Sequence, residues 1–166
     1  AINAALAGNF YSTGQVCSNG TRVFVHDTIF DRFVEEVVER TTRIRVGDPF
    51  DPEVQMGPLV SKQQLEKVGS YLEQASASDD VDIRCGGEVL ATDDLTGGYF
   101  VSPAVVVAAS DDHAVVTEEV FGPLMTILKF TDETEVIDRA NATRLGLAAA
   151  VFSQDFSRAH RVANKL

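Results

Sequence analysis

The chain has 166 residues, of which 45% are hydrophobic, so its length allows one domain with a substantial core. Its formal net charge of -11 at pH 7 disfavours a nucleic-acid-binding protein, because phosphate backbones are bound by basic patches. No apolar run approaches the roughly 20 residues of a transmembrane helix, and no signal peptide is recognisable. These properties indicate a soluble protein that acts on neither nucleic acid nor membrane.

The acidic residues are scattered along the chain and form no single run. A solvated acidic surface is the simplest interpretation of this pattern. Adaptation to a high-salt environment and steering of a cationic substrate are the alternatives, and the charge does not decide between them.

The first half of the chain predicts helices on either side of a strand. Residues 1–7 are alanine-rich and helical in pattern, and Thr21–Val25 has the β-branched and aromatic content of a short strand. Asp27 is the predicted N-cap of a helix over Thr28–Thr42. Its buried face is predicted from apolar residues at helical spacing: Ile29, Phe30, Phe33, Val34, Val37 and Val38.

The middle of the chain predicts a further helix and two strands. Ser61 is the predicted cap of a helix that runs to about Ala77. The apolar face of this helix is predicted to consist of Leu65, Val68, Tyr71 and Leu72. Val81–Cys85 and Tyr99–Ala108 are predicted strands, and Pro103 is expected to bend the second strand or to place it at an edge.

The last part of the chain continues the alternation. We expect a strand over Leu124–Phe130, a helix capped by Thr131, a strand over Leu147–Phe152 and a helical pattern from Ala159 onward. Strands that alternate with helices predict an α/β fold with a mostly parallel sheet and helices on both faces.

The segment Gly14-Gln15-Val16-Cys17-Ser18-Asn19-Gly20 places one cysteine among turn-forming residues, between a predicted helix and a predicted strand. Reactive cysteines are usually found in partly exposed loops, whereas structural cysteines pack inside an element. Spacing alone leaves a nucleophile and an ordinary loop cysteine equally open, because a base partner cannot be located from the sequence.

Three ordered motifs resemble those of the aldehyde dehydrogenase superfamily. Residues 10–22 resemble its active-site cysteine signature, residues 118–123 (Glu-Glu-Val-Phe-Gly-Pro) resemble a second signature, and residues 140–149 resemble a third. Gly47-Asp48-Pro49 and Gly57-Pro58-Leu59 are also in register, so the resemblance extends from Ala1 to Leu166.

The resemblance implies that residues 1–166 are a partial aldehyde dehydrogenase catalytic domain, without the cofactor-binding domain and the oligomerisation arm. In this family the glutamate that activates water and an Asn donor to the oxyanion lie upstream of the position of Ala1. The resemblance therefore implies that the fragment alone is inactive. A full-length relative would be a cytoplasmic homodimer or homotetramer.

The resemblance also assigns roles to three residues. Cys17 corresponds to the nucleophile, which forms a thiohemiacetal and then a thioester, with hydride transfer to NAD or NADP; its backbone N–H would help to hold the oxyanion. Glu119 corresponds to the residue that accepts hydrogen bonds from the nicotinamide ribose, a role that suits an acceptor-only carboxylate. Phe121 corresponds to the residue that packs on the nicotinamide ring.

Within the family, residues 14–25 resemble the branch that oxidises betaine aldehyde to the osmoprotectant glycine betaine. Ser12 is typical of this branch, since many other relatives have Asn there. Tyr11 corresponds to an aromatic position of the substrate pocket, where a ring attracts a quaternary ammonium group; packing in the core is the equal alternative. Val16 and Ser18 flank the thiol and are expected to shape the pocket wall.

Two other readings stay open. One is a related dehydrogenase of aminoaldehydes or semialdehydes, which either hydrolyses the thioester or passes it to coenzyme A. The other is a non-catalytic structural or interaction paralogue that keeps the fold without turnover.

The remaining cysteine and the histidines are assigned to structure or surface. Cys85, His26, His113 and His160 have no metal-ligand spacing, so no metal site is expected. Two distant cysteines also give no disulfide framework, which is typical of a protein from the reducing cytosol.

Overall fold

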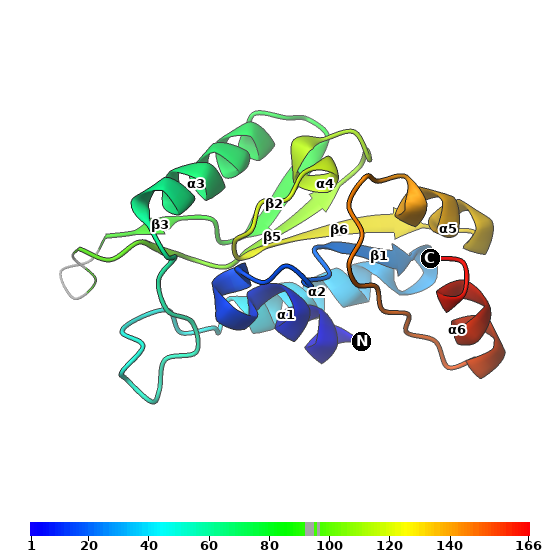
Figure 1. Ribbon diagram of the computed structural model, residues 1–166, viewed down its shortest axis with the longest axis horizontal. Helices are drawn as coiled ribbons and strands as arrows, with labels where there is room; N and C mark the ends of the chain where they lie inside the picture. The colour runs from blue at the N-terminus through cyan, green and yellow to red at the C-terminus, as the bar shows by residue number, and fades with distance from the viewer. Residues whose placement is uncertain (92–94, 96) are drawn as a thin grey trace.

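A four-stranded sheet forms the centre of the computed structural model, which describes residues 1–91, 95 and 97–166 (Figure 1). Its strands, in spatial order, are β1 (Arg22–His26), β6 (Leu124–Phe130), β5 (Ala104–Ala108) and β2 (Val81–Cys85). β6 pairs in parallel with both β1 and β5, whereas β2 is antiparallel to β5. The predicted α/β fold with a mostly parallel sheet is confirmed.

The central strand β6 is buried from Leu124 to Leu128, because helices cover both faces of the sheet. Its one buried polar side chain, Thr126, donates its hydroxyl to the carbonyl oxygen of Val115 at 3.0 Å. The sequence of β6 is accordingly an almost continuous apolar run, which is typical of a parallel strand with two covered faces.

Two hydrophobic clusters lie on opposite faces of the sheet. Helices α1 (Ile2–Phe10) and α2 (Phe30–Thr41) cover one face, and helices α3 (Lys62–Ser76) and α4 (Ala114–Thr117) cover the other (Figure 1). Neighbouring residues of one strand belong to opposite clusters, as alternating side chains require: Val105 packs with α1 and α2, and Val106 packs with α3 and α4. The expectation of helices on both faces is therefore confirmed. In the described ranges, no helix is long and apolar enough to cross a bilayer.

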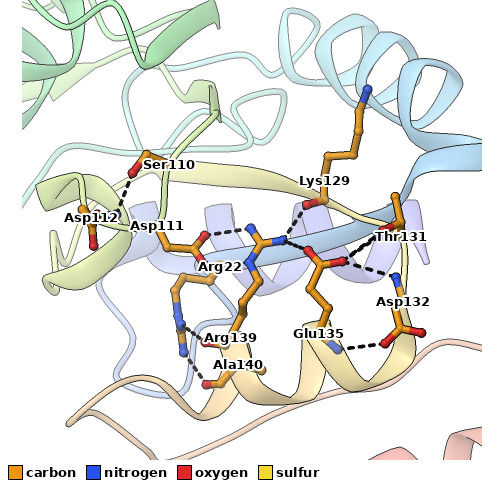
Figure 2. A network of polar contacts seen from close by, with 10 residues as sticks. All are labelled: Arg22, Ser110, Asp111, Asp112, Lys129, Thr131, Asp132, Glu135, Arg139 and Ala140. Atoms are coloured by element: carbon orange, nitrogen blue, oxygen red, sulfur yellow. Dashed lines mark hydrogen bonds and ion pairs between the residues drawn. The ribbon is translucent and has the colours of Figure 1, made fainter.

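Helix α5 (Glu133–Asn141) is anchored to the sheet by two arginines (Figure 2). Arg139 donates two hydrogen bonds to the Asp111 carboxylate, at 2.6 and 2.7 Å, and one at 2.7 Å to Glu135. Arg22, at the start of β1, donates to the backbone carbonyls of Arg139 and Ala140 at 3.2 and 2.8 Å. Arg22 thus binds two carbonyl groups in the last turn of α5, one of which, that of Arg139, also accepts the Ala142 N–H.

Two strand predictions differ from the structure. The single strand predicted over Tyr99–Ala108 forms two strands, and the interruption lies at Pro103, where a bend was expected: β4 (Phe100–Val101) pairs with β3 (Val89–Leu90) in a separate small sheet, and only β5 joins the main sheet. Residues 147–152 form no strand; no neighbouring strand pairs with them in the described part of the chain, and a single extended segment has no ladder of hydrogen bonds to stabilise it. Helix α6 (Phe156–Ala163) then ends the chain.

The predicted cap at Ser61 is confirmed, since its hydroxyl accepts a hydrogen bond from the Gln64 N–H. The cap at Asp27 is wrong: the short helix η2 (Asp27–Ile29) precedes α2, and His26 accepts the Thr28 N–H instead. Ile29 consequently lies 47% exposed, outside the predicted buried stripe.

The cap of α5 is displaced by one residue from its predicted position at Thr131. Asp132 accepts the N–H groups of Thr134 and Glu135, and Glu135 bonds back to the Asp132 N–H in a capping box. Thr131 contributes from outside the helix, where its hydroxyl and N–H both donate to Glu135.

Candidate active site

Cys17 lies in an exposed turn between α1 and β1. The Asn19 N–H donates to the Val16 carbonyl at 3.2 Å, so that Cys17 and Ser18 form the tip of the turn. The two ends of the segment meet at Gly20, whose N–H donates to the Gly8 carbonyl at 3.1 Å and whose carbonyl accepts the Asn9 side-chain amide at 3.3 Å. The thiol is thus exposed to solvent on a loop whose C-terminal end is fixed to α1 by the hydrogen bonds of Gly20.

The backbone just before the thiol is left-handed over three consecutive residues. The φ angles of Ser12, Thr13 and Gly14 are 52°, 58° and 70°. A non-glycine residue in this region costs about 1–3 kcal/mol, and the β-branched Thr13 is especially unusual there. The conformation is held by the neighbouring segment 57–60, since the Thr13 hydroxyl donates to the Gly57 carbonyl and Gln15 accepts the Val60 N–H.

The 118–123 loop, between α4 and β6, contains another left-handed residue. Phe121 has a φ of 57° and is half-buried. Gln64 of α3 donates its side-chain amide to the carbonyl oxygens of Val120 and Phe121, at 3.1 and 2.7 Å. One side chain therefore satisfies two successive backbone acceptors beside the strained residue.

One face of α3 holds the rest of this loop. Lys67 Nζ donates to the Glu119 backbone carbonyl at 2.8 Å, and the Tyr71 hydroxyl donates to the Glu118 carboxylate at 2.8 Å. Val68 lies against Gly122, where an added Cβ would be 2.4 Å from its methyl carbon. Gln64, Lys67, Val68 and Tyr71 have the spacing of a single helix face, so they contact the loop together.

The sequence reading missed this role of α3. It identified Val68 and Tyr71 only as core residues, and it passed over Gln64 and Lys67. The available signal was the position of two polar residues on the same helical face as the apolar ones.

The cysteine loop and the 118–123 loop are in direct backbone contact. An ideal Cβ on Gly14 would lie 2.1 Å from the Gly122 carbonyl oxygen and 2.7 Å from the Pro123 nitrogen. The fold therefore brings together the two segments in which sequence reasoning placed Cys17, Glu119 and Phe121.

The remaining predicted residues lie around the thiol or on the exposed part of the neighbouring loop. Tyr11 is 73% exposed, so the alternative that it packs in the core of this chain is wrong. Val16 is half-buried and Ser18 is exposed, on either side of Cys17. Glu119 is exposed, and among the described residues its carboxylate has no hydrogen-bond or ion-pair partner.

The second cysteine and the histidines have structural surroundings. Cys85 is half-buried at the end of β2, and burial raises the pKa of its thiol. His26 and His113 accept backbone N–H groups at helix starts, and the His160 ring lies 4.4 Å from that of Phe156. Within the described ranges, no three His, Cys, Asp or Glu side chains are grouped as metal ligands would be.

A cavity of about 410 Å³ lies beside the far end of the 118–123 loop, where its walls include Arg22, Asp111, Glu118 and Arg139. The residues that line it do not include Cys17, Glu119 or Phe121. This cavity belongs to the arginine network of α5, and it reaches the 118–123 loop only at Glu118.

Comparison with known proteins agrees with this arrangement. The sequence profile of the aldehyde dehydrogenase family matches residues 1–166. Betaine aldehyde dehydrogenases of Mesorhizobium japonicum and Brucella anthropi are 56% and 52% identical to the chain over 166 residues. The matches cover 100% of this chain but 34% of each of those proteins, so the chain spans about a third of the length of its curated relatives.

Solved structures show the same similarity. A crystal structure of Staphylococcus aureus betaine aldehyde dehydrogenase in complex with NAD+ has a TM-score of 0.95 and 41% identity, covering 99% of this chain and 33% of that one. An aldehyde dehydrogenase from Bacillus cereus, solved as an E194S mutant, has a TM-score of 0.93 and 42% identity, with the same coverage. From its sequence profile, its relatives and its fold together, the chain belongs to the aldehyde dehydrogenase family.

Proposed function

We propose that this chain supplies the nucleophile and the nicotinamide-ribose contact of an enzyme that oxidises betaine aldehyde to glycine betaine. The observation that carries the proposal is the contact of Gly14 with Gly122, which joins the loop of Cys17 to the loop of Glu119 and Phe121. Support for this substrate comes from the relatives that are 56% and 52% identical to the chain, since both are named betaine aldehyde dehydrogenase.

In the proposed reaction, Cys17 Sγ adds to the carbonyl carbon of the aldehyde and forms a thiohemiacetal. The backbone N–H of Cys17 donates a hydrogen bond to the resulting oxyanion. Loss of a hydride from the same carbon leaves a thioester on Cys17. Water then cleaves the thioester, which releases the carboxylate product and restores the thiol.

The residues of the 118–123 loop fit the ribose end of NAD or NADP. Glu119 has an exposed carboxylate that is unpaired among the described residues, and an ionised carboxylate can accept both O–H donors of a vicinal diol. Phe121 directly precedes Gly122, the residue in backbone contact with the cysteine loop, and its side chain is half-buried. When bound, the cofactor supplies one piece of chemistry, the acceptance of a hydride.

Tyr11, Val16 and Ser18 are proposed to contact the substrate. Tyr11 is 73% exposed and precedes the left-handed turn, so its ring is available to a ligand. A single ring attracts a quaternary ammonium group by about 0.5–2 kcal/mol, so selectivity for betaine aldehyde would need further rings.

A hybrid enzyme tests the chemistry. Residues 1–166 replace the matching third of the Mesorhizobium japonicum relative, and NAD(P)H formation with betaine aldehyde is measured for the hybrid and for its Cys17→Ala and Cys85→Ala variants. We expect turnover in the hybrid, retention of most turnover in Cys85→Ala and loss of at least about a thousandfold in Cys17→Ala. Undiminished turnover in Cys17→Ala would refute the assignment of the nucleophile.

The substrate is tested separately from the chemistry. The hybrid is assayed with betaine aldehyde, with an aminoaldehyde and with a semialdehyde, each in the presence and absence of coenzyme A. The proposal predicts the highest kcat/KM for betaine aldehyde, with a free carboxylate as product. A preference for another aldehyde, or an acyl-CoA product, would replace the substrate while leaving Cys17 as the nucleophile.

A further inference from the structure

The 118–123 loop contains two adjacent carboxylates, Glu118 and Glu119, and the structure treats them differently. The Glu118 carboxylate accepts a hydrogen bond from the Tyr71 hydroxyl at 2.8 Å. Among the described residues, the Glu119 carboxylate has no partner, although its backbone carbonyl accepts a hydrogen bond from Lys67. Both side chains are exposed, and they differ in that only the Glu118 carboxylate has a hydrogen-bond partner among the described residues.

The burial of Tyr71 favours its hydrogen bond to Glu118. The residue is 8% exposed and packs in the hydrophobic cluster of α3 with Val68 and Leu72. The phenolic O–H of a buried tyrosine usually has a hydrogen-bond partner, because leaving it unpaired is unfavourable. Glu118 is the acceptor that the structure supplies, so rotation of Glu118 away from α3 would remove the one protein partner of the Tyr71 hydroxyl among the described residues.

Lys67, on the same face of α3, binds the backbone of Glu119 and not its carboxylate. Its ammonium lies 6.0 Å from the centre of the Tyr71 ring and donates to the Glu119 backbone at 2.8 Å. The lysine therefore fixes the main chain of Glu119 and leaves its carboxylate unpaired. Both α3 side chains hold the loop, and neither occupies the oxygens of Glu119.

We propose that Tyr71 is a positioning residue that holds Glu118 against α3 and thereby leaves Glu119 as the single carboxylate free to bind a vicinal diol. The inference deepens the proposed function and rests on it for the identity of the diol, the nicotinamide ribose. The contact of Tyr71 with Glu118 is independent of any ligand. Tyr71 itself touches neither Cys17 nor the reacting atoms.

Carboxylate footprinting tests the proposal on the 166-residue chain itself. A water-soluble carbodiimide with an amine nucleophile modifies free carboxylates, and peptide fragmentation distinguishes Glu118 from Glu119. We expect Glu119 to be modified about fivefold faster than Glu118, because a hydrogen bond to a charged group must be broken at Glu118. In Tyr71→Phe the two rates should become equal within about twofold.

Tyr99→Phe is the matched control, because it removes a phenolic hydroxyl from a residue that is 36% exposed. It should leave the ratio of the two rates unchanged. Equal modification of Glu118 and Glu119 in the original chain would overturn the proposal. So would an unchanged ratio in Tyr71→Phe, or an equal loss of the ratio in Tyr99→Phe.

A second measurement covers the case in which Tyr71→Phe does not fold. Burial and the hydrogen bond to Glu118 both raise the pKa of Tyr71, and its titration can be followed by NMR of ring-labelled tyrosine. Glu118→Gln should lower the pKa of Tyr71, whereas Glu119→Gln should leave it in place. A Tyr71 titration that Glu118→Gln does not move would overturn the proposal.

These results are distinguishable from the failure of the proposed function. Footprinting and titration need neither cofactor nor turnover, so they report on the arrangement of Tyr71, Glu118 and Glu119 alone. If the hybrid enzyme is inactive while Glu119 is modified faster than Glu118 as expected, the proposed function fails and the positioning role of Tyr71 stands. If the hybrid is active and the two carboxylates react equally, the positioning role fails alone.

Discussion

Gly14 lies so close to the carbonyl oxygen of Gly122 that an added Cβ would be 2.1 Å from it, and its φ is 70°. Both conditions exclude a side chain, because the obstructing atoms are backbone and the conformation disfavours L-residues. We expect Gly14→Ala to lower the free energy of unfolding by about 3 kcal/mol, measured by urea denaturation.

Gly8→Ala is the control for this substitution. Gly8 lies within α1 and has no atom within 4 Å of an added Cβ, so alanine should fit and raise stability by about 0.5–1 kcal/mol. A Gly14→Ala variant as stable as Gly8→Ala would contradict the close contact of the two loops.

Arg139 and Asp111 form a bidentate pair that links α5 to the segment before α4 (Figure 2). A double-mutant cycle with Arg139→Ala and Asp111→Ala should give a coupling energy of about 1 kcal/mol, since the pair is only partly exposed and its geometry is fixed. The pair of Arg43 and Glu39 is far more exposed, and its cycle should give about 0.3–0.5 kcal/mol or less. Equal coupling in the two cycles would contradict the anchoring role.

Acid should weaken the fold partly through Glu135. Hydrogen bonds from Thr131 and Arg139 hold the pKa of Glu135 below its ordinary value of 4.5. Its contribution to stability is therefore present above pH 4.5 and is lost as the pH falls through the lower folded-state pKa. The stability difference between the original chain and Glu135→Gln should be largest near neutral pH and should shrink on acidification. A difference that is constant with pH would contradict this assignment.

The two cysteines should differ in reactivity toward iodoacetamide. Cys17 is exposed in its turn, whereas Cys85 is half-buried with a raised pKa. At neutral pH we expect Cys17 to be alkylated at least about tenfold faster, as followed by mass spectrometry of the two peptides. Cys17→Ser and Cys85→Ser assign the two rates, and equally slow alkylation of both thiols would favour a paralogue without turnover.

Gln64→Leu should loosen the 118–123 loop. The substitution removes both donors to the carbonyls of Val120 and Phe121, and we expect a loss of about 1–3 kcal/mol in the free energy of unfolding. Faster proteolytic cleavage within the loop should accompany it. Gln63→Leu, on the exposed side of the same helix turn, should change neither quantity by more than about 0.5 kcal/mol or twofold.

Sequence patterns predicted the strands and helices that are marked by their own residues, but not the features that depend on a distant segment of the chain. β2 and β6 were predicted with the bounds that the structure shows: β6 is a nearly continuous apolar run, and β2 alternates apolar and charged residues before the Gly86-Gly87 turn. Residues 147–152 have a similar composition but no neighbouring strand in the described part of the chain, and pairing between distant segments cannot be deduced from composition. The caps near Asp27 and Thr131 failed by a residue or more, since an adjacent histidine or aspartate could serve equally well.

The candidate site was predictable only as separate motifs. The sequence located the turn of Cys17 and the loop of Glu119, but the contact between them depends on three-dimensional packing at Gly14 and Gly122. Ser12 and Thr13 have no intrinsic preference for a left-handed backbone, so their conformation follows from tertiary bonds to residues 57–60. Tyr71 fitted the apolar face of its helix, so the sequence pattern did not reveal the hydrogen bond from its hydroxyl to Glu118.

The left-handed turn at Ser12–Gly14 is stabilised mainly by main-chain contacts and by the side chains of Thr13 and Gln15. Val16 and Ser18 beside the thiol take no part in this support through their side chains among the described residues. Substitution at these two positions should therefore alter the proposed substrate-contact surface beside Cys17 without displacing the sulfur. In the proposed enzyme, chemistry and selectivity would then depend on different residues, and such a division would let one framework diversify toward new aldehydes by single replacements.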